Sequence, residues 1–481
     1  PGSAEESGVN RALLGLSVGG PIIRDRAHLL VATEFEGRRN PPSGYNLGRD
    51  PASLVGIDEN ALETFQDFFR RELGVETGVA GPYTLKRDLG NIFARLDWNL
   101  ENGNRVTVRH VFAGADSDES PNRSPFQPYE LSSNAVFRTS TNNTTSAQLF
   151  LDMGNLGGNE IDLSIQRTTD RTEPGAIWPQ VEAVVTSPAL SYTATRPVRA
   201  GAQFFAQQND LTQTSVRLSN TLTLARGSAT WTLGATGAWH DIRQEYLPGA
   251  MGEYYFPSLT DVLNNAPQRF QQTVLEEGES PGIGFNVLEA GAFLQGQLEL
   301  GRAWTLSLGV RGDIPFLLEE PRENARVLNY FRRSTSEIPS GAVLFSPRIG
   351  INWLRHGERR TQVRGGVGLF TGQLPYVWLA NAFQNTGLRS STRVCSGRWT
   401  DDPLTGNTAP PFDAGNPSPT CLFGAPLEVR AVTLFDEDFV YPQFAKISAN
   451  LDQEITADIS ASVGFIFSAA INQVILRELN I

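Results

Sequence analysis

The sequence predicts an all-β protein whose antiparallel strands form a transmembrane β-barrel. Three observations support this class. Apolar and polar residues alternate along stretches of about ten residues, short turns join these stretches in pairs, and long polar segments separate one pair from the next. A barrel strand needs about 9–11 residues to cross a bilayer, whereas soluble strands average about five or six. The length of the alternating stretches therefore favours a membrane barrel.

The clearest pair of strands occupies residues 287–313. Leu or Ala fills almost every second position of its first arm, and Trp304, Leu306 and Val310 follow the same rule in the second arm. Because successive side chains on a strand point to opposite faces, each arm has one apolar and one polar face. The Gly-containing break at 301–303 makes the pair a hairpin.

Six further hairpins repeat this pattern, which gives about fourteen strands in all. They span residues 12–38, 91–113, 146–167, 214–240, 346–370 and 444–467. Short turns alternate with long segments at residues 39–85, 117–140, 171–210, 244–285, 314–345 and 373–440. Short periplasmic turns and long extracellular loops at alternate connections are typical of outer-membrane barrels. Sandwiches and propellers have no reason to place a long loop at every second connection, and a soluble β-protein is the weaker alternative.

Two of the long segments contain a predicted helix start. Asp58 starts a predicted short helix that carries Leu62, Phe65 and Phe69 on one side, and we expect it to pack rather than to bind. The aromatic segment 252–256 precedes a second helix start, and self-packing is again the favoured role.

A further aromatic segment surrounds Tyr376 and Trp378. External loops that capture ligands are often rich in aromatic residues, so this segment is a candidate ligand loop. Packing within the long loop is the alternative.

Composition excludes several other classes. The net charge of −12 argues against a general nucleic-acid binder, which would normally present a basic face. A mean hydropathy of −0.25 does not exclude a barrel. Apolar and polar residues alternate along each barrel strand, so their hydropathies cancel in the average. No apolar run approaches the roughly 18 residues of a membrane helix.

Two cysteines, Cys395 and Cys421, lie in one segment rich in Pro, Gly and Asp. A pair confined to one loop favours a disulfide in an oxidising compartment. The alternative is two free thiols in a reduced protein. Neither cysteine has neighbours at metal-ligand spacing.

Four tryptophans lie close to predicted short turns: Trp98, Trp231, Trp304 and Trp353. The first three also share the apolar face of their strands. This placement predicts an aromatic girdle at the periplasmic surface of the lipid bilayer.

The polar faces carry charged residues that we expect to line the barrel lumen: Arg95, Asp97, Arg109, Arg217, Arg311, Asp313 and Arg364. In a barrel with a plug, such charges would bond to the plug and to one another. A general polar lining is the alternative.

The sequence indicates no catalytic residue, no metal site and no cofactor. Its four histidines are isolated and lack H-x-x-x-H spacing. The acidic groups at 116–119, at 401–402 with Asp413, and at 436–438 lack EF-hand spacing, so solvated loop charge is the better interpretation. His240 and Asp241 near the outer rim raise the alternative of an outer-membrane hydrolase, but no G-x-S-x-G nucleophile signature accompanies them.

Several segments resemble a known family. They are GGPI at 19–22, RDR at 24–26, EFEG at 34–37, SPRIG at 346–350, RGGVGLF at 364–370 and LANAFQNTG at 379–387. In this order they resemble the barrel of Oar-like TonB-dependent receptors, which also tend to carry a cysteine pair where Cys395 and Cys421 stand. The resemblance implies a bacterial outer-membrane location and a 22-stranded barrel that is filled by an N-terminal plug. It also implies uptake of an unknown extracellular ligand with energy supplied through TonB.

We therefore expect residues 1–18 to be a tail that follows a plug domain outside this chain, and residues 19–481 to form part of a barrel. About eight strands of the family's barrel would lie beyond residue 481. The main alternative is an adhesion or structural barrel whose loops bind cells or matrix without active transport.

Overall fold

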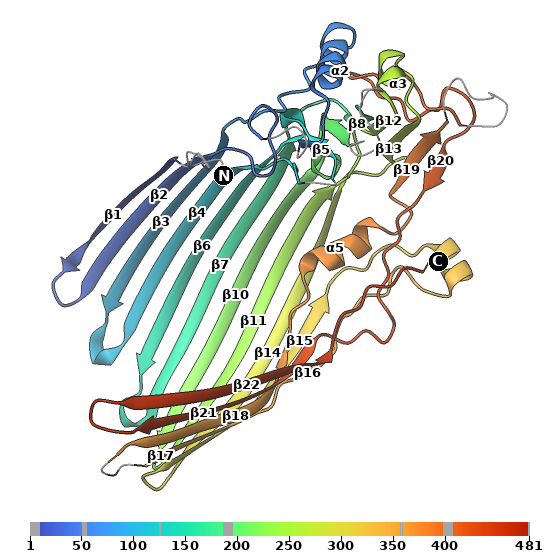
Figure 1. The fold of residues 1–481 in the computed structure, drawn as a ribbon. Helices are drawn as coiled ribbons and strands as arrows, with labels where there is room; N and C mark the ends of the chain where they lie inside the picture. Colours follow the sequence, from blue (N-terminus) through green and yellow to red (C-terminus); the bar gives the residue numbers. More distant parts are fainter. Residues whose placement is uncertain are drawn as a thin grey trace.

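The computed structural model describes residues 10–50, 55–124, 127–185, 196–355, 357, 359–397 and 407–479. The chain forms two sheets, one of fifteen strands and one of seven (Figure 1). The seven-stranded sheet lies beyond one end of the large sheet, opposite the short turns. The predicted all-β, antiparallel class is confirmed.

The large sheet contains the seven predicted hairpins in chain order, as a continuous path of fourteen strands. These strands are β1 (Asn10–Ile23), β2 (Ala27–Asn40), β3 (Leu85–Asn99), β4 (Arg105–Glu119), β6 (Val136–Asp152), β7 (Gly157–Pro174), β10 (Asn209–Arg226), β11 (Ala229–Tyr246), β14 (Gly282–Leu300), β15 (Trp304–Leu317), β17 (Arg348–Arg355), β18 (Thr361–Thr371), β21 (Gln443–Glu454) and β22 (Ser460–Asn472). The short strand β16 (Leu344–Phe345) pairs beside β15. Within the described residues β1 and β22 do not pair with each other, so the sheet is curved but open.

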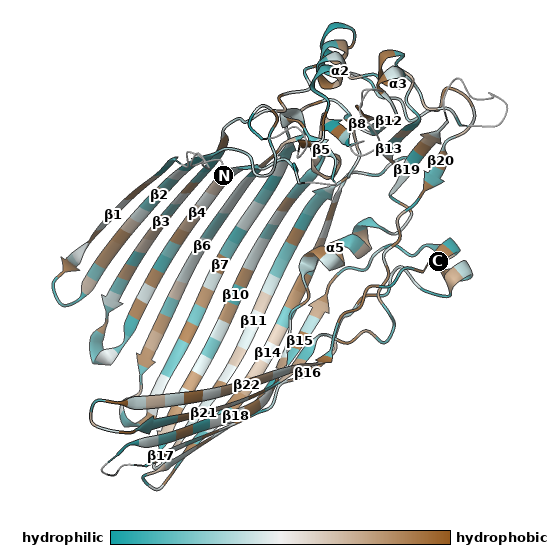
Figure 2. Cartoon of the chain, in the orientation of Figure 1, coloured by the Kyte–Doolittle hydropathy of each residue, from teal (hydrophilic) through white to brown (hydrophobic). Residues whose placement is uncertain are grey.

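Register places the alternating residues on two continuous faces. Leu294 lies opposite Leu233 on one side and Val310 on the other, which forms an apolar row. The adjacent row joins Phe293 to Arg311 and belongs to the polar face. Apolar and polar residues alternate along the strands of this sheet (Figure 2). We call the polar face the inner face and the apolar face the outer face.

Several strands are longer than the expected ten residues, and β14 reaches 19 residues. The extra residues continue past the alternating pattern toward the seven-stranded sheet. For example, Asn209 at the start of β10 still pairs with Tyr246 at the end of β11. Backbone pairing can continue where side-chain alternation stops, because the ladder uses only main-chain groups.

Four long segments contribute strands to the second sheet, which we call the loop sheet. Its strands are β5 (Tyr129–Glu130), β8 (Gln180–Val184), β9 (Pro197–Ala200), β12 (Glu253–Phe256), β13 (Arg269–Leu275), β19 (Ser390–Ser396) and β20 (Leu427–Val429). Their spatial order is β20-β19-β13-β12-β8-β9-β5. The pairs β12–β8 and β5–β9 are parallel, and the remaining pairs are antiparallel. The long segments therefore form a sheet, which their description as loops did not predict.

Short helices also lie in the long segments. They are α2 (Glu59–Arg71), α3 (Leu259–Leu263), α4 (Ala325–Phe331) and α5 (Tyr376–Gln384). Of the 3₁₀ turns, η2 (Ser132–Asn134) and η4 (Phe204–Ala206) also lie in long segments, whereas η1 (Glu101–Gly103) and η3 (Gly154–Leu156) lie in short hairpin turns. The Asp58 carboxylate caps α2 by accepting from two backbone N–H groups, as the sequence predicted for a helix start. None of these described helices has the length and apolar character needed to span a membrane.

The loop sheet and α2 enclose a core of conventional globular type. Phe65 and Phe69 of α2 are fully buried, and Phe69 packs against Trp178 and Phe412 from two other segments. Tyr254 is also buried, in agreement with the packing role expected for segment 252–256. Joining several long segments in one core keeps them in a fixed arrangement.

A disulfide between Cys395 and Cys421 lies in the same core, with the two Cα atoms 5.5 Å apart. Cys395 sits on β19 opposite Phe270 of β13. The disulfide therefore ties a strand of the loop sheet to the segment that follows it.

Two buried arginines, Arg123 and Arg196, connect the first three long segments through hydrogen bonds to backbone carbonyls. The Arg123 side chain is almost fully buried and donates to the backbone carbonyls of Val79, Gly81 and Glu130 at 2.9–3.3 Å. The guanidinium groups of Arg123 and Arg196 both lie over the phenol ring of Tyr129, 5.1 Å and 5.0 Å from its centroid. Burial lowers the pKa of Arg123 from its ordinary value. Backbone carbonyls satisfy this buried cation in place of a carboxylate partner.

Candidate functional site

The predicted lumen residues do lie on the inner face, and most of them bond to one another. Arg95 donates twice to Asp97 at 2.7 and 2.8 Å, and Arg311 makes the same fork with Asp313 at 2.8 and 2.6 Å. Arg364 of β18 donates to Asp452 of β21 at 2.7 Å. These pairs mean that much of the charge on the inner face is already neutralised within the sheet.

Two arginines from the predicted set behave differently. Within the described residues, the Arg109 side chain makes a single hydrogen bond, to Gln148 at 3.3 Å. Arg217 has no ion pair or hydrogen bond within the described part of the chain, and its side chain is exposed to the lumen. A guanidinium on the inner face that has no partner within the described residues is a candidate ligand contact.

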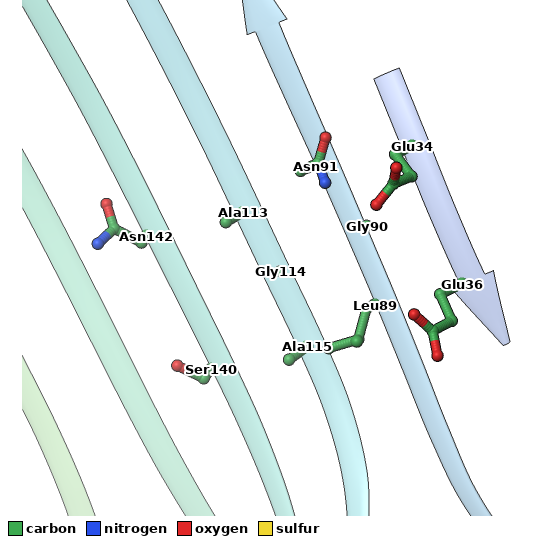
Figure 3. Close-up of a pocket in the computed structure, with 10 residues that line it drawn as sticks. All are labelled: Glu34, Glu36, Leu89, Gly90, Asn91, Ala113, Gly114, Ala115, Ser140 and Asn142. Carbon is green, nitrogen blue, oxygen red and sulfur yellow. The ribbon is translucent and has the colours of Figure 1, made fainter. Parts of the chain in front are cut away.

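A first hollow on the inner face lies over β2, β3, β4 and β6. Glu34 and Glu36 stand at one side and Asn142 at the other, with the small side chains of Ala113 and Ala115 between them (Figure 3). Its volume is about 290 Å³. The hollow is acidic, because Glu34 has no ion pair within the described residues, whereas Glu36 pairs with Arg11 at 2.8 Å.

Helix α5 reaches the inner face from the longest predicted loop. Leu379 and Ala380 pack on Ile242 and Val287, which are fully buried beneath the helix. Phe383 stacks on Phe285 with ring centroids 4.7 Å apart. The polar alternation of β11 and β14 therefore gives way to apolar residues where the helix covers the sheet.

A polar cluster fixes the first turn of α5. The Glu289 carboxylate accepts from the Tyr376 hydroxyl at 2.9 Å and from the Gln373 amide at 2.8 Å, and its second oxygen lies 3.7 Å from Nε2 of His240. The other ring nitrogen of His240 contacts Oγ of Ser215 at 2.8 Å. Burial, followed by the Glu289 carboxylate, raises the pKa of Tyr376 from its ordinary value.

Sequence reasoning found only part of this cluster. It singled out Tyr376 and His240, but it did not connect them with Glu289, Ser215 or Gln373. These three residues occur on regular alternating stretches or in a loop, and no local spacing marks them. Trp378, the other predicted loop aromatic, is half-buried against a small cluster that includes Leu344.

The arrangement of Ser215, His240 and Glu289 bears on the hydrolase alternative. Asp241 is not part of it, because Asp241 points to the opposite face and contacts Arg243 at 3.1 Å. Ser215 lies in the middle of β10, where the strand pairs with β7 and β11 on both sides. Its neighbouring N–H groups are thus used in the sheet ladder, whereas an acyl-transfer site needs free donors for an oxyanion. The geometry fits a structural cluster better than a nucleophile site.

The four predicted girdle tryptophans lie near the short turns. Trp304 and Trp353 are directly opposite each other on β15 and β17, with ring centroids 5.8 Å apart, so Trp353 shares the apolar face with Trp304. Trp98 and Trp231 are 47% and 41% exposed on the same face. Large exposed indoles in this position suit a membrane interface.

The acidic segments do not gather into a metal site in the described part of the chain, where no three potential ligands converge. Asp116, Asp118 and Glu119 instead bond separately, to Thr139, to the backbone N–H of Lys86 and to Arg138. Asp401, Asp402 and His356 lie outside the described residues.

Comparisons with known proteins define the class. Residues 76–481 match the family described as the outer membrane beta barrel domain, so the chain belongs to this family and is an outer-membrane protein. No curated protein sequence matches the chain.

Similar solved structures come from bacterial transporters and receptors. The outer membrane transporter YddB of Escherichia coli has a TM-score of 0.57 at 11% identity, over 96% of this chain and 47% of that one. The siderophore receptor PirA of Acinetobacter baumannii has a TM-score of 0.50 at 10% identity, over 96% and 50%. At such low identity the likeness concerns the fold, and the chain spans about half the length of these structures.

Proposed function

We propose that this chain is part of the barrel of an Oar-like TonB-dependent receptor, which binds an external ligand and passes it inward by energy-coupled uptake. The observation that carries the proposal is the path of α5. A segment between β18 and β21, on the side of the long connections, folds back onto the inner face of the barrel wall. Segments that join the outer surface to the interior are suited to accept a ligand from outside.

Two further observations support this proposal: the sequence motifs resemble the receptor family, and the fold is similar to that of outer-membrane transporters and receptors. A plug domain and TonB, both outside this chain, would supply closure of the barrel and energy. Under this proposal the free edges of β1 and β22 pair with further strands, since unpaired edges do not persist in lipid.

An adhesion barrel is a second candidate, and the loop sheet is the observation that supports it. A sheet with its own core and a disulfide presents a fixed surface, which suits contact with cells or matrix as well as ligand capture. In this candidate binding needs no energy from the inner membrane.

One experiment separates the two candidates. Solutes removed from the medium would be measured by mass spectrometry for cells with and without the complete gene, before and after a protonophore collapses the proton gradient. We expect gene-dependent depletion of at least one solute that stops with the protonophore. Binding to cells or matrix that is unaffected by the protonophore, without any solute depletion, would instead support the adhesin.

A further inference from the structure

A second hollow opens on the inner face beside the first turn of α5, and its volume is about 380 Å³. Its walls come from β7, β10, β11 and the segment that leads into α5. The lining residues include Ser164, Gln166, Arg217, His240, Gln373 and Tyr376. This volume lies within the range of about 300–1,000 Å³ that is usual for small-molecule sites.

Arg217 supplies the positive charge of this hollow. Register places it between Ser164 of β7 and Ala238 of β11, and neither neighbour is an acid. Arg95, Arg311 and Arg364 are each held by a carboxylate, whereas Arg217 has none within the described residues. A guanidinium that is free of partners can give two parallel hydrogen bonds to an oxyanion.

The start of α5 adds a second feature that favours negative charge. This nine-residue helix begins after Pro375, and no side chain caps its first N–H groups. Pro375 and Tyr376 both line the hollow. Uncapped N–H groups at a helix start attract anions through hydrogen bonds and the helix dipole.

The nearest acid does not cancel these features. Glu289 is not among the lining residues. One of its oxygens accepts from Tyr376 and Gln373, and the other lies 3.7 Å from Nε2 of His240, beyond hydrogen-bond distance. The His240 side chain is 4% exposed, and its Nε2 lacks a hydrogen-bond partner in the described structure. Among the other polar groups of the lining, Ser215, Gln373 and Tyr376 are already hydrogen-bonded, whereas the side chains of Ser164 and Gln166 make no hydrogen bond within the described residues.

We propose that this hollow binds the anionic group, a carboxylate or phosphate, of a polar ligand, with Arg217 as its main contact. The inference rests on the proposed role as a ligand receptor and names the chemical class of its ligand. The hollow of Figure 3 serves for comparison: it lies on the same face but is lined by Glu34 and Glu36, so we do not expect it to bind an anion.

The test uses the full-length protein, purified from outer membranes in detergent, and ligand-observed NMR. Three probes are compared: gluconate, glucose 6-phosphate and the uncharged analogue glucitol. We expect the two anions to bind and glucitol to bind at least about tenfold more weakly. Arg217→Gln should reduce anion affinity about tenfold or more, because it removes a charge-assisted contact.

Two variants serve as matched controls. Arg226→Gln removes the same charge from the exposed end of the same strand, and Glu34→Gln changes the acidic hollow. Neither should alter anion binding. Retention of full affinity by Arg217→Gln, equal binding of glucitol, an equal loss in Arg226→Gln, or no binding of either anion would overturn the proposal.

The outcome is independent of uptake. Arg217-dependent binding in detergent without energy-dependent depletion in cells would contradict transport but keep the site. Energy-dependent depletion without Arg217-dependent binding would contradict the site and keep transport.

Discussion

The large sheet, which forms the barrel wall, and the loop sheet are stabilised in different ways. In the wall, each hairpin pairs with the next hairpin in the chain, all neighbours are antiparallel, and large apolar side chains such as Leu294 stay exposed on the outer face. In the loop sheet, short strands from four distant segments pair in mixed directions around buried aromatics such as Phe69. Lipid takes the place of a core for the wall, whereas the loop sheet must build its own.

The largest expected effect tests whether the loop sheet depends on its own core. Phe69→Ala should destabilise it by about 3–5 kcal/mol, because a fully buried ring is replaced by a cavity. We expect rapid proteolysis of the long segments in detergent, while unheated samples still migrate as a folded barrel on gels. Thr64→Ala on the exposed side of α2 is the control. Loss of the barrel band together with the loop sheet would show that the two regions fold as one.

The next effect tests whether lipid acts as the core of the wall. Leu294→Arg should cost about 2–4 kcal/mol, since it places a charge on the lipid face of the sheet. Gln297→Arg, on the inner face of the same strand, should be tolerated. Urea unfolding of the protein in lipid vesicles would measure both variants. Equal costs would contradict the assignment of the two faces.

A smaller effect concerns the buried arginines of the loop sheet. Arg123→Lys keeps the charge but cannot reach three separate carbonyls with one ammonium group, so it should destabilise this region by about 1–3 kcal/mol. Hydrogen exchange of the segments around residues 79–81 and 130 should become faster. Arg70→Lys, an exposed helix residue, should show no change. Unchanged exchange in Arg123→Lys would mean that the carbonyls find other donors.

The smallest effect is expected from an inner-face ion pair. Arg311 and Asp313 are both partly exposed, so Arg311→Gln should change stability by only about 0–1 kcal/mol. Urea unfolding in vesicles, at low and high salt, would measure it. A cost as large as that of Leu294→Arg would mean that this pair is shielded from water, as it would be against a plug domain.

Hairpin order, strand faces and turn positions could be predicted because each depends on residues close in sequence. The alternation from Leu288 to Leu300 and the break at Gly301 suffice to define one hairpin, and the same argument placed the inner arginines on their face. The start of α2 was likewise visible in Asp58 and the residues that follow. Local signals do not reveal which distant segments meet.

The sequence by itself thus determined the barrel wall, because a two-residue period specifies both faces of every strand wherever lipid lies on one side. Only the tertiary structure decided the loop sheet, where Phe270 pairs with Cys395 across more than a hundred residues. It also decided the docking of α5, which joins Tyr376 to Glu289 and puts Arg217, which has no carboxylate partner among the described residues, in the lining of a hollow. These contacts depend on how folded segments fit together in space, and no periodicity records that fit.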